Sequence, residues 1–290
     1  MGKRALVLGG GGPVGIAWES GLIAGLAEAG IDLARADFIV GTSAGSVVGA
    51  QLATGRSAVS LADSFIGKGE LPSSPSESLA APPDLSVLAT KLMESYAGVR
   101  PAEEVCAEIG AWALSAPTMS EEAFLASFGH TMAGLPENFW PERRYSCTAV
   151  DAVSGEFTEW GNESSVSLVR AVASSCAVPG IFPPVSINGG KYMDGGMRSG
   201  TNADLAKGYE IVVVISVSSG ALPEVFRRPL ERELQLLRDS GSRVELLQPD
   251  AGSLESFGPN LMDYRRRPAA AVAGILQGKA GMAGLRELWE

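Results

Sequence analysis

Short apolar runs alternate with glycine turns and helical patterns over the first 55 residues. Residues 5–8 and 38–40 are apolar runs beside glycines, as in buried strands. Each run is followed by a glycine-containing turn and then by apolar residues at near-helical spacing, which stop near Gly30 and Gly55. The order strand, glycine loop, helix, strand, tight turn, helix predicts a mostly parallel sheet with helices on its faces.

The pattern changes between residues 56 and 140. Segment 71–86 is rich in Ser and Pro, which is typical of an irregular surface segment, and 87–134 has an amphipathic helical pattern. We interpret 56–140 as a helical insertion between strands of the sheet. Two roles stay open for it: a cap over a site, or helices that only cover the sheet.

Sheet patterns return in the second half of the chain. The strands expected there are 145–150, 157–160, 211–217 and 244–247. Helices are expected over 166–174 and, as one or two segments, over the tail 269–289. All 290 residues therefore fit one α/β domain that carries a helical insertion.

Composition and charge exclude several classes of protein. The net charge of −10 comes from 33 acidic and 23 basic side chains and argues against binding to nucleic acid. The three cysteines show no CxxC spacing and no nearby histidine cluster, so we expect neither a zinc site nor a cofactor. No run approaches the roughly 20 apolar residues of a membrane span, and the apolar run at the N-terminus is too short for a signal peptide. We interpret the protein as cytoplasmic, at most peripherally attached to membranes.

The turn after the second predicted strand has the pattern Gly-x-Ser-x-Gly. Gly41 and Gly45 stand two residues before and after Ser43. In a nucleophile elbow, glycines at these positions remove side chains that would collide with the strand and the helix, so the serine hydroxyl projects at the helix N-terminus. The pattern predicts that Ser43 is a nucleophile, and the alternative is a glycine-rich turn with a capping serine.

The glycine loop of residues 10–15 has two interpretations. It matches Gly-x-Gly-x-x-Gly between a strand and a helix, as in dinucleotide-binding proteins. It could equally direct backbone N–H groups at an oxyanion. A dinucleotide site also needs an acidic residue at the end of the second strand, and Asp32 and Asp37 both precede that strand. This weakens the nucleotide interpretation.

A serine nucleophile needs a base, and the sequence offers one histidine. His130 lies in the insertion, and no histidine follows it, so the order Ser, acid, His of an α/β-hydrolase triad is not met. A carboxylate would then have to accept the proton of Ser43. Asp194 is the best placed, because it follows a short apolar stretch and precedes two glycines. Its alternative role is that of an ordinary turn aspartate.

Taken together, four segments resemble the patatin-like phospholipase family in kind and in order. They are the glycine loop, the serine turn, an Ala-Ser stretch that ends in Pro, and Asp-Gly-Gly: residues 10–15, 41–45, 173–179 and 194–196. The resemblance covers residues 4 to about 217. It implies a three-layer α/β/α fold with a mostly parallel central sheet. It also implies hydrolysis of lipid or other acyl esters by a Ser–Asp dyad without a catalytic histidine.

The resemblance also assigns roles to individual residues. Ser43 would be the nucleophile and Asp194 its general base, with a pKa that we expect to be raised by burial. The oxyanion hole would be formed by backbone N–H groups of Gly10, Gly11, Gly12 and Ala44. Further glycines shape the three turns: Gly15, Gly41, Gly45, Gly195 and Gly196.

One position departs from the family pattern. Many relatives carry Arg or Lys beside the last loop glycine, where this chain has Val14. Val14 at this position weakens the expectation that phospholipids are preferred substrates. It bears less on the expectation of ester hydrolysis. Two other functions stay open: a nucleotide-binding protein that uses the glycine loop, and a catalytically idle scaffold of the same fold.

Overall fold

The structure is a computed structural model that describes residues 2–67, 85–128, 132, 135–136, 139–218, 223–280 and 283–290. Its strands are β1 (Arg4–Leu8), β2 (Phe38–Gly41), β3 (Tyr145–Asp151), β4 (Phe157–Trp160), β5 (Val185–Ile187), β6 (Gly190–Asp194), β7 (Ile211–Ile215) and β8 (Arg243–Leu247). Its helices are α1 (Gly12–Glu28), α2 (Ala44–Ala53), α3 (Asp63–Ile66), α4 (Ser86–Ala97), α5 (Ala102–Ser115), α6 (Glu121–Ser127), α7 (Leu168–Ser175), α8 (Glu224–Asp239), α9 (Ala251–Phe257), α10 (Arg267–Lys279) and α11 (Ala283–Trp289).

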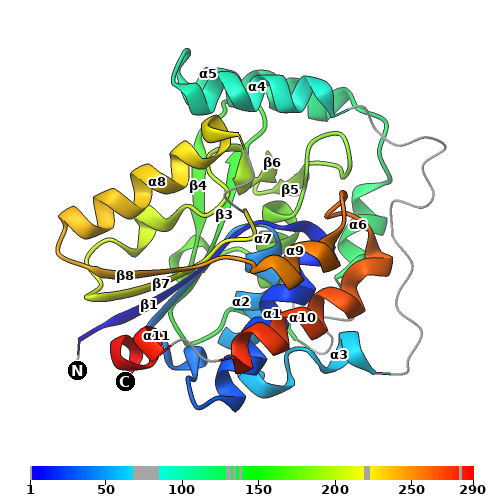
Figure 1. Ribbon diagram of the computed structural model, residues 1–290. Helices are drawn as coiled ribbons and strands as arrows, with labels where there is room; N and C mark the ends of the chain where they lie inside the picture. Colours follow the sequence, from blue (N-terminus) through cyan, green and yellow to red (C-terminus); the bar gives the residue numbers. More distant parts are fainter. Residues whose placement is uncertain are drawn as a thin grey trace.

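The strands form one mixed sheet in the order β5-β6-β3-β2-β1-β7-β8, with β4 also paired to β3. The central strands β3, β2, β1, β7 and β8 are parallel, whereas β4 and β6 run antiparallel to β3. Helices cover both faces of the sheet, with α8 on one side and α1, α2 and α10 on the other (Figure 1). The expected α/β/α layers and mostly parallel sheet are confirmed.

Alternate residues of each central strand enter two different cores. Leu6 and Leu8 of β1 pack with residues of α1, α2 and α10, while Ala5 and Val7 pack with Leu234 of α8 and its neighbours. Since both faces are covered, the strand is apolar throughout rather than alternating. This explains why the short apolar runs identified the central strands correctly.

Several expectations about single elements need correction. Helix α1 begins at Gly12, inside the glycine loop that we expected to precede it, because Pro13 suits the first turn of a helix. Strand β5 and the helices α8 and α9 were not expected. His130 and most of the Ser- and Pro-rich segment lie outside the described residues. None of the helices that the structure describes is long and apolar enough to span a membrane.

Glycines let α1 and α10 pack backbone against backbone. A Cβ on Gly21 would lie 2.1 Å from the carbonyl oxygen of Ala271, and one on Gly25 would lie 2.3 Å from that of Ile275. No side chain fits in either gap. This contact fixes α10 along α1 and brings the N-terminal ends of the two helices to the same part of the molecule (Figure 1).

Candidate active site

Ser43 occupies a strained turn between β2 and α2. Its φ of 51° and ψ of −117° lie in a region that residues other than glycine rarely adopt. A Cβ on Gly41 would lie 2.4 Å from the Gly45 carbonyl oxygen, and one on Gly45 would lie 2.2 Å from that of Leu8. Both glycines are therefore sterically required, as the Gly-x-Ser-x-Gly pattern predicts.

Three neighbouring side chains hold the backbone of Ser43 in this conformation. The Ser43 N–H donates to Ser175 Oγ at 2.9 Å. Its carbonyl oxygen accepts from Ser46 Oγ at 2.6 Å and from Cys176 Sγ at 3.3 Å. Ser175 and Cys176 belong to the Ala-Ser stretch that the sequence marked as a family segment without a role. Its role here is to bind the polar backbone groups of the nucleophile turn.

The register of β3 explains how Asp194 reaches Ser43. Strand β4 pairs with residues 147–150 along one edge of β3. On the other edge, Gly41 at the end of β2 lies opposite Cys147. Asp194 at the end of β6 lies opposite Ala149 on that same edge. Because β2 and β6 run toward each other, their last residues meet two positions apart along β3.

Asp194 is buried, and its carboxylate lies close enough to the Ser43 side chain to interact with it. The carboxylate is 2% exposed, and its Oδ1 accepts from the Gly196 N–H at 2.7 Å. Burial raises the pKa of Asp194 from 3.8 to about 7, while the hydrogen bonds from Ser43 and Gly196 act in the opposite direction. The raised pKa is the direction expected from the sequence, and it makes the carboxylate a stronger base than an exposed aspartate.

We expect the rate of ester hydrolysis to increase with pH through about 7, because only the ionised Asp194 can accept a proton. Well below the pKa, kcat/KM should fall about tenfold per pH unit. The measurement is kcat/KM for a water-soluble ester between about pH 5 and pH 8, where the folded state is checked by circular dichroism. A flat profile over this range would contradict a role for a carboxylate with this pKa.

The glycine loop lies directly beside Ser43. A Cβ on Gly10 would be 3.4 Å from Ser43 Cβ, and the Gly10 N–H donates to the Gly200 carbonyl at 2.8 Å. The Gly10 N–H is therefore already hydrogen-bonded within the protein. This is contrary to the expectation that Gly10 donates a hydrogen bond to an oxyanion. For Gly11, Gly12 and Ala44, no acceptor of the N–H is found in the described part of the chain. These three groups are the ones available to an oxyanion.

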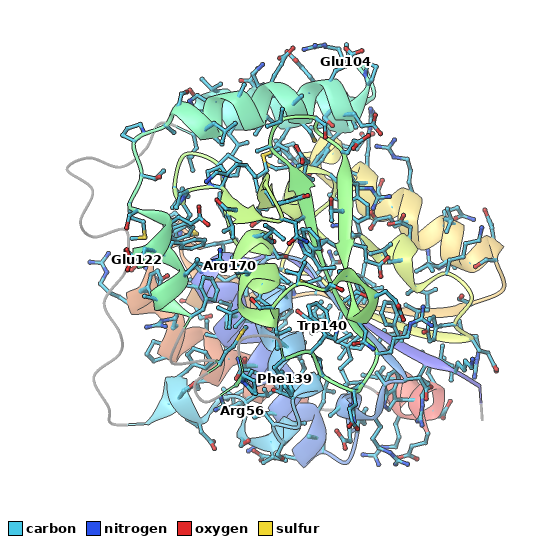
Figure 2. The ribbon with its side chains drawn as sticks, turned by 180° about the vertical axis from the view of Figure 1, so that it is seen from behind. Arg56, Glu104, Glu122, Phe139, Trp140 and Arg170 are labelled. Atoms are coloured by element: carbon cyan, nitrogen blue, oxygen red, sulfur yellow. The ribbon has the colours of Figure 1, made fainter. Side chains whose placement is uncertain are left out.

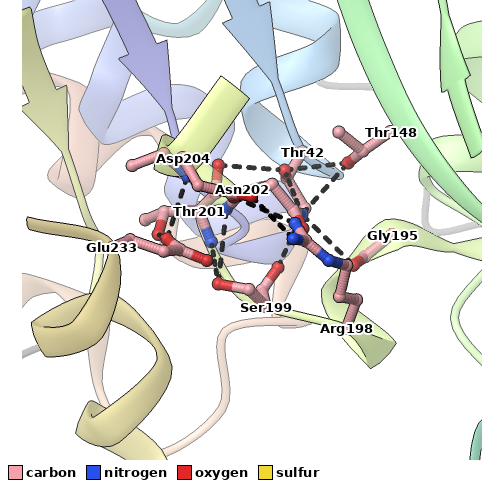
Figure 3. Close-up of polar contacts among 10 residues, drawn as sticks. Thr42, Thr148, Gly195, Arg198, Ser199, Thr201, Asn202, Asp204 and Glu233 are labelled. Carbon is pink, nitrogen blue, oxygen red and sulfur yellow. Dashed lines mark hydrogen bonds and ion pairs between the residues drawn. The ribbon is translucent and has the colours of Figure 1, made fainter. Parts of the chain in front are cut away.

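Asn202 connects the turn of Ser43 with the turn of Asp194. Its Nδ2 donates to Thr42 Oγ1 at 3.0 Å and lies 3.3 Å from the Gly195 carbonyl oxygen (Figure 3). Thr42 immediately precedes Ser43, and Gly195 immediately follows Asp194. Asn202 is fully buried and has the left-handed backbone conformation that asparagine tolerates. It fixes the two turns relative to each other.

A buried carboxylate supports the loop that carries Asn202. Glu233 of α8 accepts from Thr201 Oγ1 at 2.6 Å and from the Ala203 N–H at 2.9 Å (Figure 3). Burial raises its pKa above the ordinary value, and these hydrogen bonds oppose the rise. Neither Asn202 nor Glu233 stands in a motif, so nothing in the sequence alone singles them out.

Ser43 opens into a cavity of about 520 Å³. Gly12 and Ala44, with two of the candidate oxyanion N–H groups, line it as well. Phe124 of α6 and Phe182 form part of its apolar wall, with their rings stacked at a centroid distance of 4.6 Å. The volume is in the range of small-molecule sites, and the lining suits an acyl chain. Among the described residues, no cluster of His, Cys, Asp or Glu could hold a metal ion.

Helix α6, from the insertion, is anchored beside this cavity by Glu121. The carboxylate accepts from the Ser186 N–H at 2.8 Å and from Lys191 Nζ at 2.9 Å, and Arg170 Nη1 of α7 lies 3.4 Å from it. Figure 2 shows Arg170 on α7 and Glu122 on α6, on adjoining helices. The insertion therefore supplies part of the cavity wall, which goes beyond covering the sheet.

The fold and the strained Ser43 are features of α/β proteins that carry a nucleophile elbow. A family model described as patatin-like phospholipase matches residues 6–207, which is more than two thirds of the 290 residues. The chain belongs to the patatin-like phospholipase family.

Individual proteins in the comparisons share only low sequence identity with this chain. A lysophospholipase nte1 of Aspergillus niger is 28% identical over 229 residues, which are 76% of this chain and 12% of that protein. The chain thus spans about an eighth of the curated relative that it matches. Two solved structures are similar over 99% of this chain. VipD from Legionella pneumophila has 14% sequence identity and a TM-score of 0.46, and 67% of that chain is covered. The type III effector protein ExoU has 17% sequence identity and a TM-score of 0.41, and 53% of that chain is covered.

Proposed function

We propose that this protein hydrolyses lipid or other acyl esters with Ser43 as nucleophile and Asp194 as general base. The observation that carries the proposal is the placement of the strained Ser43 beside a buried carboxylate, Asp194, whose pKa is raised to about 7. Membership of the patatin-like phospholipase family supports the substrate class.

The mechanism is a two-step acyl transfer. Asp194 accepts the Ser43 proton as Oγ attacks the ester carbonyl, and the negative charge collects on the former carbonyl oxygen. The N–H groups of Gly11, Gly12 and Ala44 stabilise this oxyanion, where one lost donor typically costs about 10²- to 10³-fold in rate. Collapse releases the alcohol, which takes the proton from Asp194. Water then attacks the acyl-enzyme and gives a proton to Asp194. Collapse of the second oxyanion breaks the bond to Ser43 Oγ, which takes this proton back from Asp194, and releases the fatty acid.

A nucleotide-binding role for the glycine loop is less well supported. The Leu261 carbonyl oxygen accepts from the Val14 N–H at 3.2 Å, at the helix terminus where a pyrophosphate would bind. A Cβ on Gly12 would be 2.8 Å from this carbonyl and 2.9 Å from Met262 Sδ. The chain itself therefore occupies space that the phosphates would need.

Labelling with a fluorophosphonate tests the proposed function against both rivals. We expect a covalent adduct on Ser43, found by peptide mapping, because an activated serine attacks phosphorus as it attacks an ester carbonyl. The control is protein unfolded by denaturant before labelling, which should not react. An unlabelled Ser43 in the folded protein would favour the idle scaffold. A rise in melting temperature with NAD or ATP, together with no labelling, would favour the nucleotide-binding protein.

A further inference from the structure

A second cavity, of about 280 Å³, borders the glycine loop. Its walls come from α4, α8, the loop itself and the segments that follow β6 and β7. The cavity that contains Ser43 has walls from α1, α2, α6 and the first turn of α10, where Arg267 lies. Among the described residues, none lines both cavities. The site therefore offers separate places for the two parts of an ester.

Gly10 and Gly200 bring the second cavity next to the nucleophile. Both residues line this cavity. A Cβ on Gly10 would lie 3.4 Å from Ser43 Cβ and 3.7 Å from the Gly200 carbonyl oxygen, so the three residues meet at one point. A Cβ on Gly200 would meet no atom of the described residues within 4 Å. Because neither glycine has a side chain, no group at these two positions separates Ser43 from the cavity.

The position of Asp194 decides which part of the ester faces the second cavity. In the proposed mechanism the alcohol takes its proton from Asp194, so it leaves on the side of this carboxylate. Tyr96 of α4 lines the second cavity, and its hydroxyl donates to the Gly196 carbonyl oxygen at 2.6 Å, two residues after Asp194. Gly200 belongs to the same segment of the chain. The alcohol part of the ester therefore faces the second cavity, and the acyl chain faces the apolar wall of the other.

Four of the residues that line the second cavity carry a hydroxyl group: Tyr96, Thr201, Ser216 and Ser218. Thr201 Oγ1 donates to Glu233 at 2.6 Å, and the hydroxyl oxygens of Ser216 and Ser218 are 2.6 Å apart. A hydroxyl group that donates its proton still accepts hydrogen bonds through its lone pairs. These oxygens therefore suit a ligand that donates hydrogen bonds, as an alcohol does.

The second cavity offers no charge to an ionic head group. Among the described residues that line it, there is no Asp, Glu, Lys, Arg or His. A phosphate placed there would lose its hydration without a cation to compensate for the loss. Leu92, Phe226 and Leu230 supply apolar wall that suits the carbon atoms of a small ligand. The volume lies just below the range of about 300–1,000 Å³ that is usual for small-molecule sites. The lining therefore favours a small, uncharged polyol.

We propose that this cavity binds the alcohol part of the ester that Ser43 attacks, and that it selects a small uncharged polyol such as a glycerol moiety. The inference rests on the proposed function and adds the substrate class on the alcohol side. When the bond between the acyl carbon and the alcohol oxygen breaks, the oxygen takes the proton that Asp194 received from Ser43. The free polyol then lies in the second cavity, from which it diffuses away.

The test compares three esters with the same octanoyl chain, each below its micelle concentration: methyl octanoate, octanoylglycerol and octanoylglycerol 3-phosphate. We expect kcat/KM of the wild type to be highest for octanoylglycerol. In Ser218→Ala the ratio of kcat/KM for octanoylglycerol to kcat/KM for methyl octanoate should fall about 2- to 10-fold, the effect of one hydrogen bond. Gly200→Leu adds a side chain to the wall of the cavity, and the ratio should fall about tenfold or more.

The controls make the same changes at exposed positions: Ser240→Ala at the end of α8 and Gly252→Leu on α9. Both should keep the wild-type ratio. A ratio measured within one preparation does not depend on the fraction of folded enzyme. Wild-type ratios in Ser218→Ala and Gly200→Leu would overturn the inference, and so would a wild type that prefers the phosphate ester. Failure of the proposed function looks different, because Ser43→Ala would then still hydrolyse methyl octanoate.

A binding measurement tests the same cavity without turnover. The ligand is 1-O-octylglycerol, an ether that the enzyme cannot hydrolyse, titrated by calorimetry into the Ser43→Ala variant. We expect binding that weakens about tenfold or more when Gly200→Leu is added. Equal affinity in the two variants would also overturn the inference.

Discussion

Replacing Ser43 with alanine is expected to reduce kcat for ester hydrolysis by about 10⁴- to 10⁶-fold, because the variant has no atom that can form the acyl-enzyme. Folding should be preserved, since the backbone of the turn is held by hydrogen bonds from Ser46 and Cys176 to the Ser43 carbonyl, which do not involve its side chain. Alanine at this positive φ is as strained as serine, so the melting temperature should change little.

The matched control is Ser57→Ala, at an exposed serine of the loop after α2. Its activity should equal that of the wild type. The measurement is steady-state hydrolysis of a p-nitrophenyl ester, with circular dichroism to compare folding. Turnover in folded Ser43→Ala at a tenth of the wild-type rate or more would contradict the nucleophile assignment.

Replacing Asp194 with asparagine is expected to lower kcat about 10²- to 10⁴-fold, the usual loss when a general base is removed. Asparagine has nearly the same shape and can still accept the Gly196 N–H that now bonds to Oδ1. It cannot take the proton of Ser43. The pH dependence through about 7 should vanish in whatever activity remains, because the titrating group is gone.

The thermal stability of Asp194→Asn distinguishes the loss of a general base from the loss of the folded structure. The folded pKa of Asp194 is raised from 3.8 to about 7, so between these values the native state holds a proton that the unfolded chain has released. The stabilisation from this proton is complete at low pH and is lost as the pH rises through about 7. Above that pH the wild type bears a buried charge that the variant lacks.

Asp194→Asn should therefore melt at the same temperature as the wild type or higher near pH 8. Asp239→Asn, at an exposed position of α8, serves as the matched control and should change neither activity nor pH profile. If Asp194→Asn keeps full activity with an unchanged pH profile, Asp194 is not the base.

The features readable from the sequence are those that depend on near neighbours along the chain. The turn of Ser43 needs glycine at position 41 because a side chain there would strike Gly45 and Ser46 of the same turn. The central strands could be recognised because residues buried on both faces are continuously apolar. Helix α8 was not expected because its polar exposed face gives it few apolar positions.

The neighbours of Ser43 could be identified only from the tertiary structure. Asp194 meets Ser43 only because β6 pairs antiparallel with β3 on the edge that β2 also uses. Asn202 and Arg267 come from a loop and a helix far along the chain, without a motif around them. Their positions beside the turn of Ser43 and at the cavity follow from packing after folding, and no spacing in the sequence encodes them.

The sequence by itself determined the α/β class and the strained turn of Ser43, and it selected Asp194 as a candidate base, since local sterics and strand burial leave a signature in consecutive residues. The tertiary structure decided the rest of the site. It showed that Gly10 donates to Gly200, that α6 from the insertion forms part of the cavity wall, and that the cavity receives its cation from α10. These contacts join residues distant in the chain, and only the packing of helices and strands brings them together.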